Sequence, residues 1–283
     1  MIPDRQQVVG IVGLGLIGGS LAKAYKDAGW RVYGYDLVES VTRFGELDGT
    51  LDGELHAEHL ANCDLVHLAV TPDAACEWLR ENASRISAAT LVMDDCGTKR
   101  KICETGFALA REHGFVYVGA HPMAGTHQWG YKNSRGNLFQ GAPMVIVPPR
   151  FDDPDLYERI KRLLAPLGLG HLVFAGAEEH DRMIAFTSQL AHVVSNAYVK
   201  SPRAQQHRGF SAGSFRDLTR VAWLNERMWA ELFLENGDFL VDEIDTLIAN
   251  LQEYATAIRD HDGARLEEIL REGRIAKEKT EKA

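Results

Sequence analysis

The sequence is poor in cysteine and in long apolar runs. Its 283 residues include only 4 cysteines, none in a C-x-x-C pair, so it indicates neither a disulfide framework nor a zinc ribbon and fits a reducing cytoplasm. The uncharged stretch near the N-terminus, residues 8–22, is short and dotted with glycines. Such a segment is too short to cross a bilayer and lacks the basic start of a signal peptide.

Basic residues are also fewer than acidic ones. Lys and Arg number 31 against 40 Asp and Glu, which gives a formal net charge of -9. An acidic surface repels phosphate backbones and anionic lipids, so we expect neither a nucleic acid nor a membrane as partner. A small anionic substrate stays open, because a few arginines can make a single cleft positive. The histidines show no metal-ligand spacing, and we expect no metal site.

Short β-branched runs alternate with helical patterns in the first half of the chain. This alternation predicts right-handed βαβ units and a parallel sheet, which is an α/β doubly wound, Rossmann-type fold. The expected strands are residues 8–12, 31–35, 65–70, 91–94, 115–119, 144–147 and 171–175. The strand pattern stops after Gly176. We therefore expect a dinucleotide-binding domain over residues 1–176 and an all-helical domain over residues 177–283.

The second half opens with a helical pattern over residues 178–199. Apolar side chains recur there at spacings of three and four, which is one face of a helix. They are Met183, Phe186, Leu190, Val193 and Ala197. A second stripe is small and polar, and it consists of Asp181, Ala185, Ser188, His192 and Ser195. His192 therefore faces either a cleft or a buried hydrogen-bond partner.

A glycine-rich loop follows the first expected strand. The string from Gly13 to Gly18 has the form G-x-G-x-x-G and leads into a helical pattern. In this fingerprint Gly13 permits the tight turn, Gly15 lets the backbone approach a pyrophosphate, and Gly18 lets helix and strand pack closely. Asp36 ends the next expected strand, where a carboxylate can bond the ribose hydroxyls of an adenosine.

This order of strand, loop, helix and acid predicts a dinucleotide site. Asp36 favours NAD, because its charge repels the 2′-phosphate of NADP. NADP stays open, since Arg31 or Arg43 lies near enough in sequence to approach that phosphate. FAD, which uses the same fingerprint, and a turn without any ligand are the weaker alternatives. The expected cofactor contacts are Gly13, Gly15, Leu16, Ile17, Gly18, Asp36, Val70 and Thr71.

Further strings carry a resemblance to a known family. They are Asp94 to Lys99 (DDCGTK), His121 to Thr126 (HPMAGT), Glu179 to Asp181 (EHD), Ser188 to His192 (SQLAH) and Phe215 to Ala222 (FRDLTRVA). In order and spacing, these strings resemble the prephenate/arogenate dehydrogenases of tyrosine biosynthesis over nearly the whole chain. The resemblance implies a Rossmann domain, a helical domain that forms a homodimer, and an active site in the cleft between them. It also implies NAD-dependent oxidative decarboxylation of prephenate, arogenate or both.

The chemistry that the resemblance implies needs a base, because the ring hydroxyl must lose its proton as hydride leaves the carbon that bears it. His121 is the candidate, since a neutral imidazole suits this task near pH 7 and open α/β sheets place ligands at the carboxyl ends of strands. Arg220 matches the substrate-binding arginine of the family, although spacing alone favours a surface pair with Asp217. The resemblance further implies substrate contacts at His192, Gly125 and Thr126.

The sequence departs from the family pattern at one informative place. The usual string is D-x-G-S-x-K, and Gly97 stands where its serine is expected to bond the catalytic histidine or the substrate. We expect the neighbouring Thr98 to supply that hydroxyl, which makes it the second catalytic candidate. Lys99 is expected to meet Asp94 or Asp95. His180 is expected to be a structural or interdomain group.

Two alternatives stay open. One is another oxidoreductase with a Rossmann and a helical domain, such as a β-hydroxyacid dehydrogenase relative, which lacks the HPMAG string and for which Lys200 is a weak catalytic candidate. The other is a non-catalytic, redox-sensing NAD-binding module, which does not need His121, His192 and Arg220 to converge. The sequence does not decide between prephenate and arogenate, or between a monomer and a dimer. We expect no regulatory ACT extension of the kind that some relatives carry.

Overall fold

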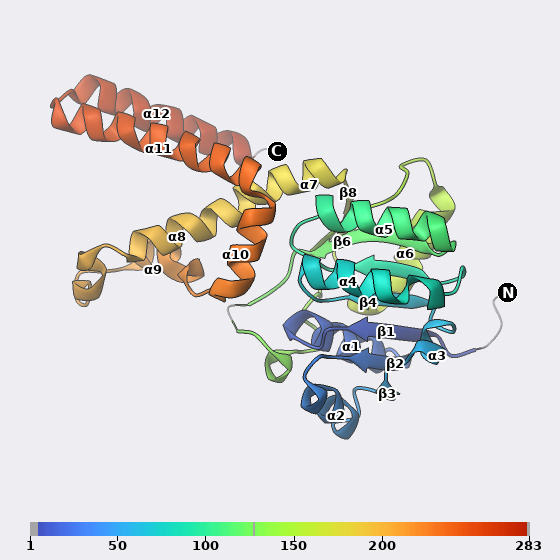
Figure 1. Cartoon of the computed structure of the whole chain (residues 1–283). Coiled ribbons are helices and arrows are strands. Elements are labelled where there is room, and N and C mark those ends of the chain that lie inside the picture. The colour runs from blue at the N-terminus through green and yellow to red at the C-terminus, as the bar shows by residue number, and fades with distance from the viewer. Residues whose placement is uncertain (1–4, 127, 282–283) are drawn as a thin grey trace.

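The computed structural model describes residues 5–126 and 128–281. One half is an eight-stranded sheet with helices on both faces, and the other is a group of helices that extends to one side of it (Figure 1). The strands are β1 (Val8–Val12), β2 (Arg31–Tyr35), β3 (Gly53–Glu54), β4 (Leu65–Leu68), β5 (Leu91–Asp94), β6 (Val116–Pro122), β7 (Pro143–Val147) and β8 (His171–Phe174). The helices of this half are α1 (Leu16–Asp27), α2 (Glu39–Leu47), α3 (Ala57–Leu60), α4 (Pro72–Asn82), α5 (Arg100–His113) and α6 (Pro154–Leu164).

The strands lie in the order β3-β2-β1-β4-β5-β6-β7-β8. Neighbours pair in parallel except for β6 and β7, which are antiparallel. The doubly wound fold is confirmed, in a sheet that is parallel except for this one pair. Parallel neighbours need a crossover element, and the described residues between Pro122 and Pro143 form only the short 3-10 turn Tyr131–Asn133. The chain therefore reverses its direction at that point.

Two apolar clusters cover the two faces of the sheet. On one face, Met93 of β5 packs with Leu21 of α1 and Leu163 of α6. On the other face, Val92 of β5 belongs to a cluster with Leu79 of α4. Successive residues of β5 thus point to opposite sides and are buried on both, as in other central parallel strands. The polar groups that follow the strands gather at the carboxyl edge of the sheet.

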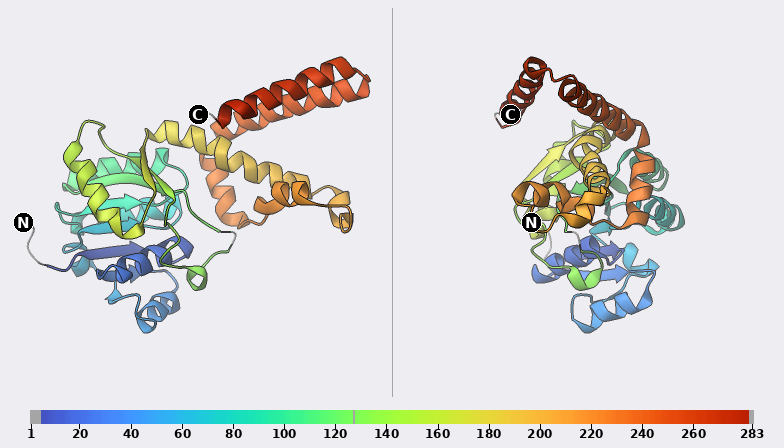
Figure 2. Two further views of the ribbon diagram at one scale, coloured as in Figure 1. Left: turned by 180° about the vertical axis from the view of Figure 1, so that it is seen from behind. Right: turned by 90° about the vertical axis from the view of Figure 1, so that its left-hand side faces the viewer.

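The helical half follows β8 directly. Its elements are α7 (Ala177–Ile184), a π-helical turn (Ala185–Leu190), α8 (Ala191–Val199), α9 (Gly213–Thr219), α10 (Glu226–Glu235), α11 (Gly237–Arg259) and α12 (Gly263–Thr280). The π-helical turn interrupts the single helix expected over residues 178–199. α11 and α12 form a hairpin that reaches away from the sheet (Figures 1 and 2). Among the described residues, none of the helices has both the length and the apolar character needed to cross a membrane.

Burial along α7 and α8 runs against the usual rule that an apolar stripe faces the core. Met183 and Phe186 of the apolar stripe are 55% and 56% exposed. Asp181 and Ser195 of the polar stripe are each 1% exposed. Within one copy of the chain, the polar stripe is the face that packs inward, and these two apolar side chains lie open.

Candidate active site

The glycine loop joins β1 to α1 at the carboxyl edge of the sheet. Gly13 has a φ of +86°, and a Cβ there would lie 2.4 Å from Cγ1 of Val70. A Cβ on Gly18 would lie 1.7 Å from the carbonyl oxygen of Gly13, whereas one on Gly15 would meet nothing within 4 Å. The loop is thus closely packed at Gly13 and Gly18 and open at Gly15, where the fingerprint places a pyrophosphate.

Two helix N-termini accompany this loop. α1 begins at Leu16, and its N-cap Gly15 has no side chain to bond the first N–H groups, among them those of Leu16 and Ile17. α4 begins after Thr71, whose side chain makes no capping hydrogen bond either. The N–H groups at the start of α1 suit an anion such as a pyrophosphate, whereas at the start of α4 the N–H of Asp73 donates to Oε1 of Glu231 at 3.4 Å. The glycine loop and α1 therefore fit a dinucleotide.

Asp36 follows β2 directly and is fixed by backbone groups. Its Oδ2 accepts the N–H of Leu14 at 2.8 Å, and its Oδ1 accepts the N–H of Val38 at 2.9 Å. Of the two arginines that left NADP open, Arg43 forms an ion pair with Glu39 and Arg31 is exposed. The charged side chain that is hydrogen-bonded to the glycine loop is therefore the carboxylate of Asp36 and not an arginine.

His121 lies in β6, opposite Val145 of β7, whereas the expected strand ended before it. Its imidazole is partly buried, and its Nδ1 lies 2.9 Å from Nε2 of His180 at the start of α7. Burial, together with His180 and the Lys99 ammonium, holds the pKa of His121 well below its usual value. The ring is therefore neutral near pH 7.

His180 in turn contacts its neighbour Asp181. The distance from His180 Nδ1 to Asp181 Oδ1 is 2.8 Å, and the two residues are 2% and 1% exposed. Asp181 Oδ1 also accepts the N–H of Lys99 at 2.7 Å, and Oδ2 accepts the N–H of Arg100 at 2.9 Å. Asp181 thus binds the start of α5 and joins the helical half to the sheet.

Thr98 does not support His121. Its Oγ1 donates to Oε2 of Glu235 at 2.6 Å, while the His121 imidazole bonds to His180. The expectation that Thr98 supplies the hydroxyl of the missing serine to this imidazole is therefore wrong. The physical reason is the position of α10, whose Glu235 offers the hydroxyl a charged acceptor.

Lys99 has the structural role that was expected of it. Its side chain is fully buried and its Nζ donates to Asp94, which also accepts the hydroxyl of Tyr117 at 2.5 Å. Burial alone would lower the pKa of Lys99, but the Asp94 carboxylate outweighs burial and raises it. Lys99 is therefore a buried cation whose charge is felt by the nearby imidazole of His121.

His192 and Arg220 lie together in the helical half. The Nδ1 of His192 donates to the carbonyl oxygen of Ser188 at 2.9 Å, and its ring stacks on Trp229 with 3.9 Å between ring centroids. Burial lowers the pKa of His192, and the Arg220 guanidinium lowers it further. Arg220 is exposed, and within residues 5–126 and 128–281 it makes no ion pair, so the surface pair with Asp217 is not found.

Gly125 and Thr126 follow β6 in an exposed loop. Thr126 Oγ1 accepts the N–H of Gln128 at 3.2 Å, and a Cβ on Gly125 would meet nothing within 4 Å. Gly125 and Thr126 therefore leave open space in the loop that follows His121. The structure thus brings His121 to His180 and Arg220 near His192, and α7, the π-helical turn and α8 connect the two pairs.

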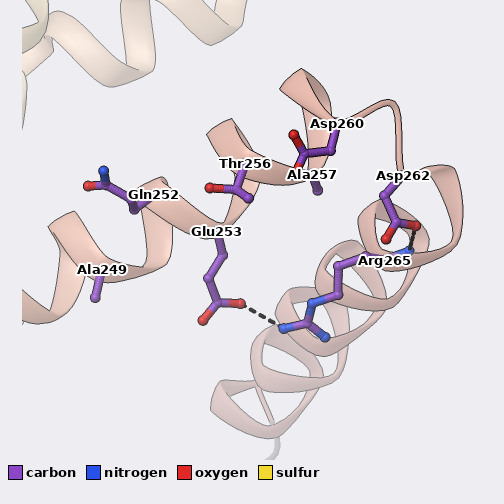
Figure 3. A pocket seen from close by; sticks show the side chains of 8 residues that line it. All are labelled: Ala249, Gln252, Glu253, Thr256, Ala257, Asp260, Asp262 and Arg265. Atoms are coloured by element: carbon purple, nitrogen blue, oxygen red, sulfur yellow. Dashed lines mark hydrogen bonds and ion pairs between the residues drawn. The ribbon is translucent and has the colours of Figure 1, made fainter.

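A hollow on the α11–α12 hairpin contains none of these residues (Figure 3). Arg265 crosses it to reach Glu253 at 2.7 Å, and Asp262 beside it caps α12 through the N–H of Arg265 at 2.9 Å. The charged groups Arg265, Glu253 and Asp262 thus already bond one another. The hairpin hollow is therefore not the active site.

Comparison with known proteins places the chain in a family. The family model described as "Prephenate dehydrogenase, nucleotide-binding domain" matches residues 21–173, and "Prephenate dehydrogenase, dimerization domain" matches residues 176–272. The chain belongs to the prephenate dehydrogenase family. The first match begins after the glycine loop, so the loop is separate evidence for the nucleotide site.

Individual relatives are similar along most of their length. A cyclohexadienyl dehydrogenase of Zymomonas mobilis is 31% identical over 281 residues, which cover 95% of this chain and 94% of that protein. A prephenate dehydrogenase of Bacillus subtilis is 29% identical over 268 residues, which cover 90% and 71%. A solved prephenate dehydrogenase from A. aeolicus, in complex with hydroxyphenyl propionate and NAD+, superposes with a TM-score of 0.81 at 28% identity, covering 98% of this chain and 99% of that one.

One contact to the family's histidine string was missed by the sequence analysis. His180 was expected to be a structural or interdomain group, and its contact with His121 does join the two halves, but its place as the hydrogen-bond partner of the candidate base was not foreseen. The signals in the sequence are that His180 stands in one of the family strings, EHD, and that Asp181 follows it directly at the junction of the two halves. Sequence distance hides the contact, because 59 positions separate His121 from His180.

Proposed function

We propose that this chain catalyses the oxidative decarboxylation of prephenate, arogenate or both, with NAD as the hydride acceptor, in tyrosine biosynthesis. The observation that carries the proposal is the neutral, partly buried imidazole of His121 at the carboxyl edge of the sheet in a member of this family. The names of the relatives, prephenate and cyclohexadienyl dehydrogenases, support the substrate class.

We assign His121 to accept one proton from the substrate and to return it to the product. The nicotinamide, when bound, accepts the hydride from the ring carbon that bears the hydroxyl. We assign the Nε2 of His121 to take the hydroxyl proton as a carbonyl develops. The ring carboxylate then leaves as carbon dioxide, its bonding electrons make the ring aromatic, and His121 returns the proton to the phenolate oxygen. Overall, one hydride and one carbon dioxide leave the substrate and no proton is taken up or released.

The dinucleotide is assigned to the glycine loop. Gly13, Gly15 and Gly18 shape the loop, and the N–H groups of Leu16 and Ile17 at the start of α1 suit the pyrophosphate. Asp36 favours NAD, because its fixed carboxylate accepts ribose hydroxyls and repels a 2′-phosphate. Val70 and Thr71, between β4 and α4, complete the proposed contacts.

The substrate is assigned to Arg220 and His192 of the helical half. Arg220 is exposed and available to grip a carboxylate through two hydrogen bonds. His192 lies beside it, and its Nδ1–H is already committed to Ser188, so its Nε2 is the atom left for the substrate. Gly125 and Thr126 form the rim next to His121.

The working unit is assigned as a homodimer, with a dinucleotide-binding domain over 1–176 and a helical domain over 177–283. Val241, Ile248, Leu251 and Ile258 of α11 are 51–59% exposed and recur at spacings of seven and three. That spacing is the apolar seam of paired helices, so a second copy fits this face. All four cysteines are free, and we propose a reducing, cytoplasmic location.

The alternatives are weaker. Another Rossmann-plus-helical oxidoreductase does not account for the two family matches, which together reach from residue 21 to residue 272. A non-catalytic module gives no reason for a neutral base next to a buried acid at this edge of the sheet.

Steady-state assays with prephenate and arogenate, each with NAD and NADP, test the proposal. We expect reduced nicotinamide and carbon dioxide in equal amounts with at least one of the two substrates, and faster turnover with NAD. A 2-hydroxy acid serves as the control substrate. Turnover of that acid, with none of prephenate or arogenate, would refute the assignment.

A further inference from the structure

The tautomer of His121 can be read from the hydrogen bonds behind it. Asp181 accepts three N–H groups, those of the backbone of Lys99 and Arg100 and of Arg100 Nε at 3.3 Å, and its Oδ1 lies 2.8 Å from His180 Nδ1. Burial alone would raise the pKa of Asp181, but the bonds from His180 and the backbone N–H groups outweigh it and lower the pKa. Asp181 is therefore an anion without a proton to give, and His180 must carry its proton on Nδ1.

The position of the proton on His180 determines the direction of the hydrogen bond between His180 and His121. Burial lowers the pKa of His180, so its ring is neutral near pH 7 and its Nε2 carries a lone pair. The 2.9 Å contact between that Nε2 and Nδ1 of His121 is then a hydrogen bond donated by His121. With its proton on Nδ1, His121 keeps the lone pair on Nε2. Among the described residues no group bonds that Nε2.

We propose that His180 and Asp181 are positioning residues, which hold His121 in the tautomer whose free Nε2 faces the substrate and stabilise the proton it takes up. This inference rests on the proposed role of His121 as the base. Neither residue reaches the substrate itself, because both are almost fully buried. The second contact of Asp181, with the start of α5, ties this orientation to the docking of the helical half on the sheet.

The arrangement also explains how the chain works without the serine of the family pattern. Gly97 has no hydroxyl, and that of Thr98 is bonded to Glu235. His180 fills the role of an oriented hydrogen-bond partner for the base. The other charges that act on the two imidazoles are Lys99 and Asp94, which pair with each other in the sheet half.

Two variants of His180 test the proposal. In His180→Gln, the amide oxygen can accept from His121 Nδ1–H while the amide NH2 donates to Asp181. His180→Leu can do neither. We expect the Leu variant to lose roughly 10-fold to 100-fold in kcat with KM within threefold, and the Gln variant to recover most of that loss. Equal kcat values in the Leu and Gln variants would refute the proposal.

The pH profile separates this role from a structural one. The repulsion by which His180 lowers the pKa of His121 acts only when His180 is itself protonated. A neutral His180 accepts from His121 Nδ1–H and makes His121 a stronger base, so the acid limb of kcat/KM should move to lower pH in His180→Leu and return in His180→Gln. An unchanged limb, or one moved to higher pH, would overturn the proposal. His67→Gln is the control, because His67 is also buried beside a carboxylate, with its Nδ1 2.8 Å from Asp95. It should lower Tm and leave the limb in place.

A measurement without turnover makes the inference separable from the proposed function. NMR of nitrogen-labelled histidine rings in the enzyme alone, near pH 7, distinguishes a protonated from an unprotonated ring nitrogen. We expect a proton on Nδ1 of His121 and none on Nε2, with the preference lost in His180→Leu. A proton on Nε2 in the wild type would refute the tautomer. Inactivity toward both substrates, with this tautomer present, would refute only the proposed function.

Discussion

The two halves of the chain bury different kinds of side chain. Of the 50 buried apolar residues among those described, all but 6 belong to the sheet half. The helical half instead buries polar groups where it meets the sheet, including Gln189 and Asn236, which bond each other at 2.8 Å. Its large apolar residues, such as Leu251 and Ile258, are more than half exposed.

This difference shows how each half gains its stability. The sheet half has a closed core on both faces and can be stable within one copy. The helical half holds to it through directional contacts, such as the bonds of Arg100 to Asp181, Asn236 and Asp238, and leaves much of its apolar area exposed. Hydrogen bonds depend on direction more strongly than apolar contacts do. They therefore hold the orientation of the two halves at the junction that contains His180.

If the sheet half supplies the chemistry, its base should dominate kcat. His121→Asn should lower kcat roughly a hundredfold or more with little change in the KM of either substrate, the usual size of a lost general base. Stopped-flow and steady-state absorbance of reduced nicotinamide measure both. The matched control is His171→Asn, an exposed histidine of β8. Wild-type turnover in His121→Asn would remove this residue from the mechanism.

If the helical half is completed by a second copy, a charge on its open face should separate the dimer. Leu251→Glu removes an apolar side chain and forces a carboxylate into the seam, so the dimer Kd should rise roughly 30-fold or more. Sedimentation over a range of concentrations measures this. Leu47→Glu is the control, because Leu47 is 85% exposed on α2 of the sheet half. Identical assembly of both variants would show that the seam is not the interface.

If the helical half grips the substrate, its arginine should act on KM. Arg220→Gln removes a charge-assisted pair, and the substrate KM should rise roughly 10-fold to 30-fold while kcat stays within a few-fold. Arg216→Gln, one turn earlier and exposed like Arg220, is the control. A fall in kcat at constant KM would place Arg220 in the chemical step instead.

The fold was largely predictable because its signals are local. The parallel strands of the sheet half have β-branched runs flanked by helical patterns, and each signal lies within a few residues of the feature it predicts. The reversed direction of β7 was not predictable, because it depends on what the residues after Pro122 fail to form. The two-residue strand β3 was missed because Gly53 and Glu54 have low strand propensity.

Individual residues of the site were predictable from the sequence, but the contacts between them were not. The glycine loop and His121 stand in strings that identify them without knowledge of the fold. The partners of His121 and Thr98 come from α7 and α10, far along the chain, so no spacing rule could find them. The exposed faces of Met183 and Phe186 were equally hidden, because periodicity shows that a helix has an apolar face and not what covers it.

The smallest expected effect concerns the junction itself, where folding depends on pH. His180 and His121 have pKa values lowered in the fold, whereas unfolded histidines titrate near 6.5. Below about pH 6.5 the unfolded chain therefore binds more protons than the folded one, and the free energy of unfolding falls as the pH falls. His180→Gln removes one such site, so the fall of its free energy of unfolding with falling pH should be less steep, by up to about 1.4 kcal/mol per pH unit.

Urea unfolding between pH 7.5 and 5.5 at fixed protein concentration measures both slopes, with the exposed His171→Gln as control. Equal slopes in the wild type and His180→Gln would mean that His180 is not held neutral at the junction, and that polar contacts there do not couple the two halves in the way their burial suggests.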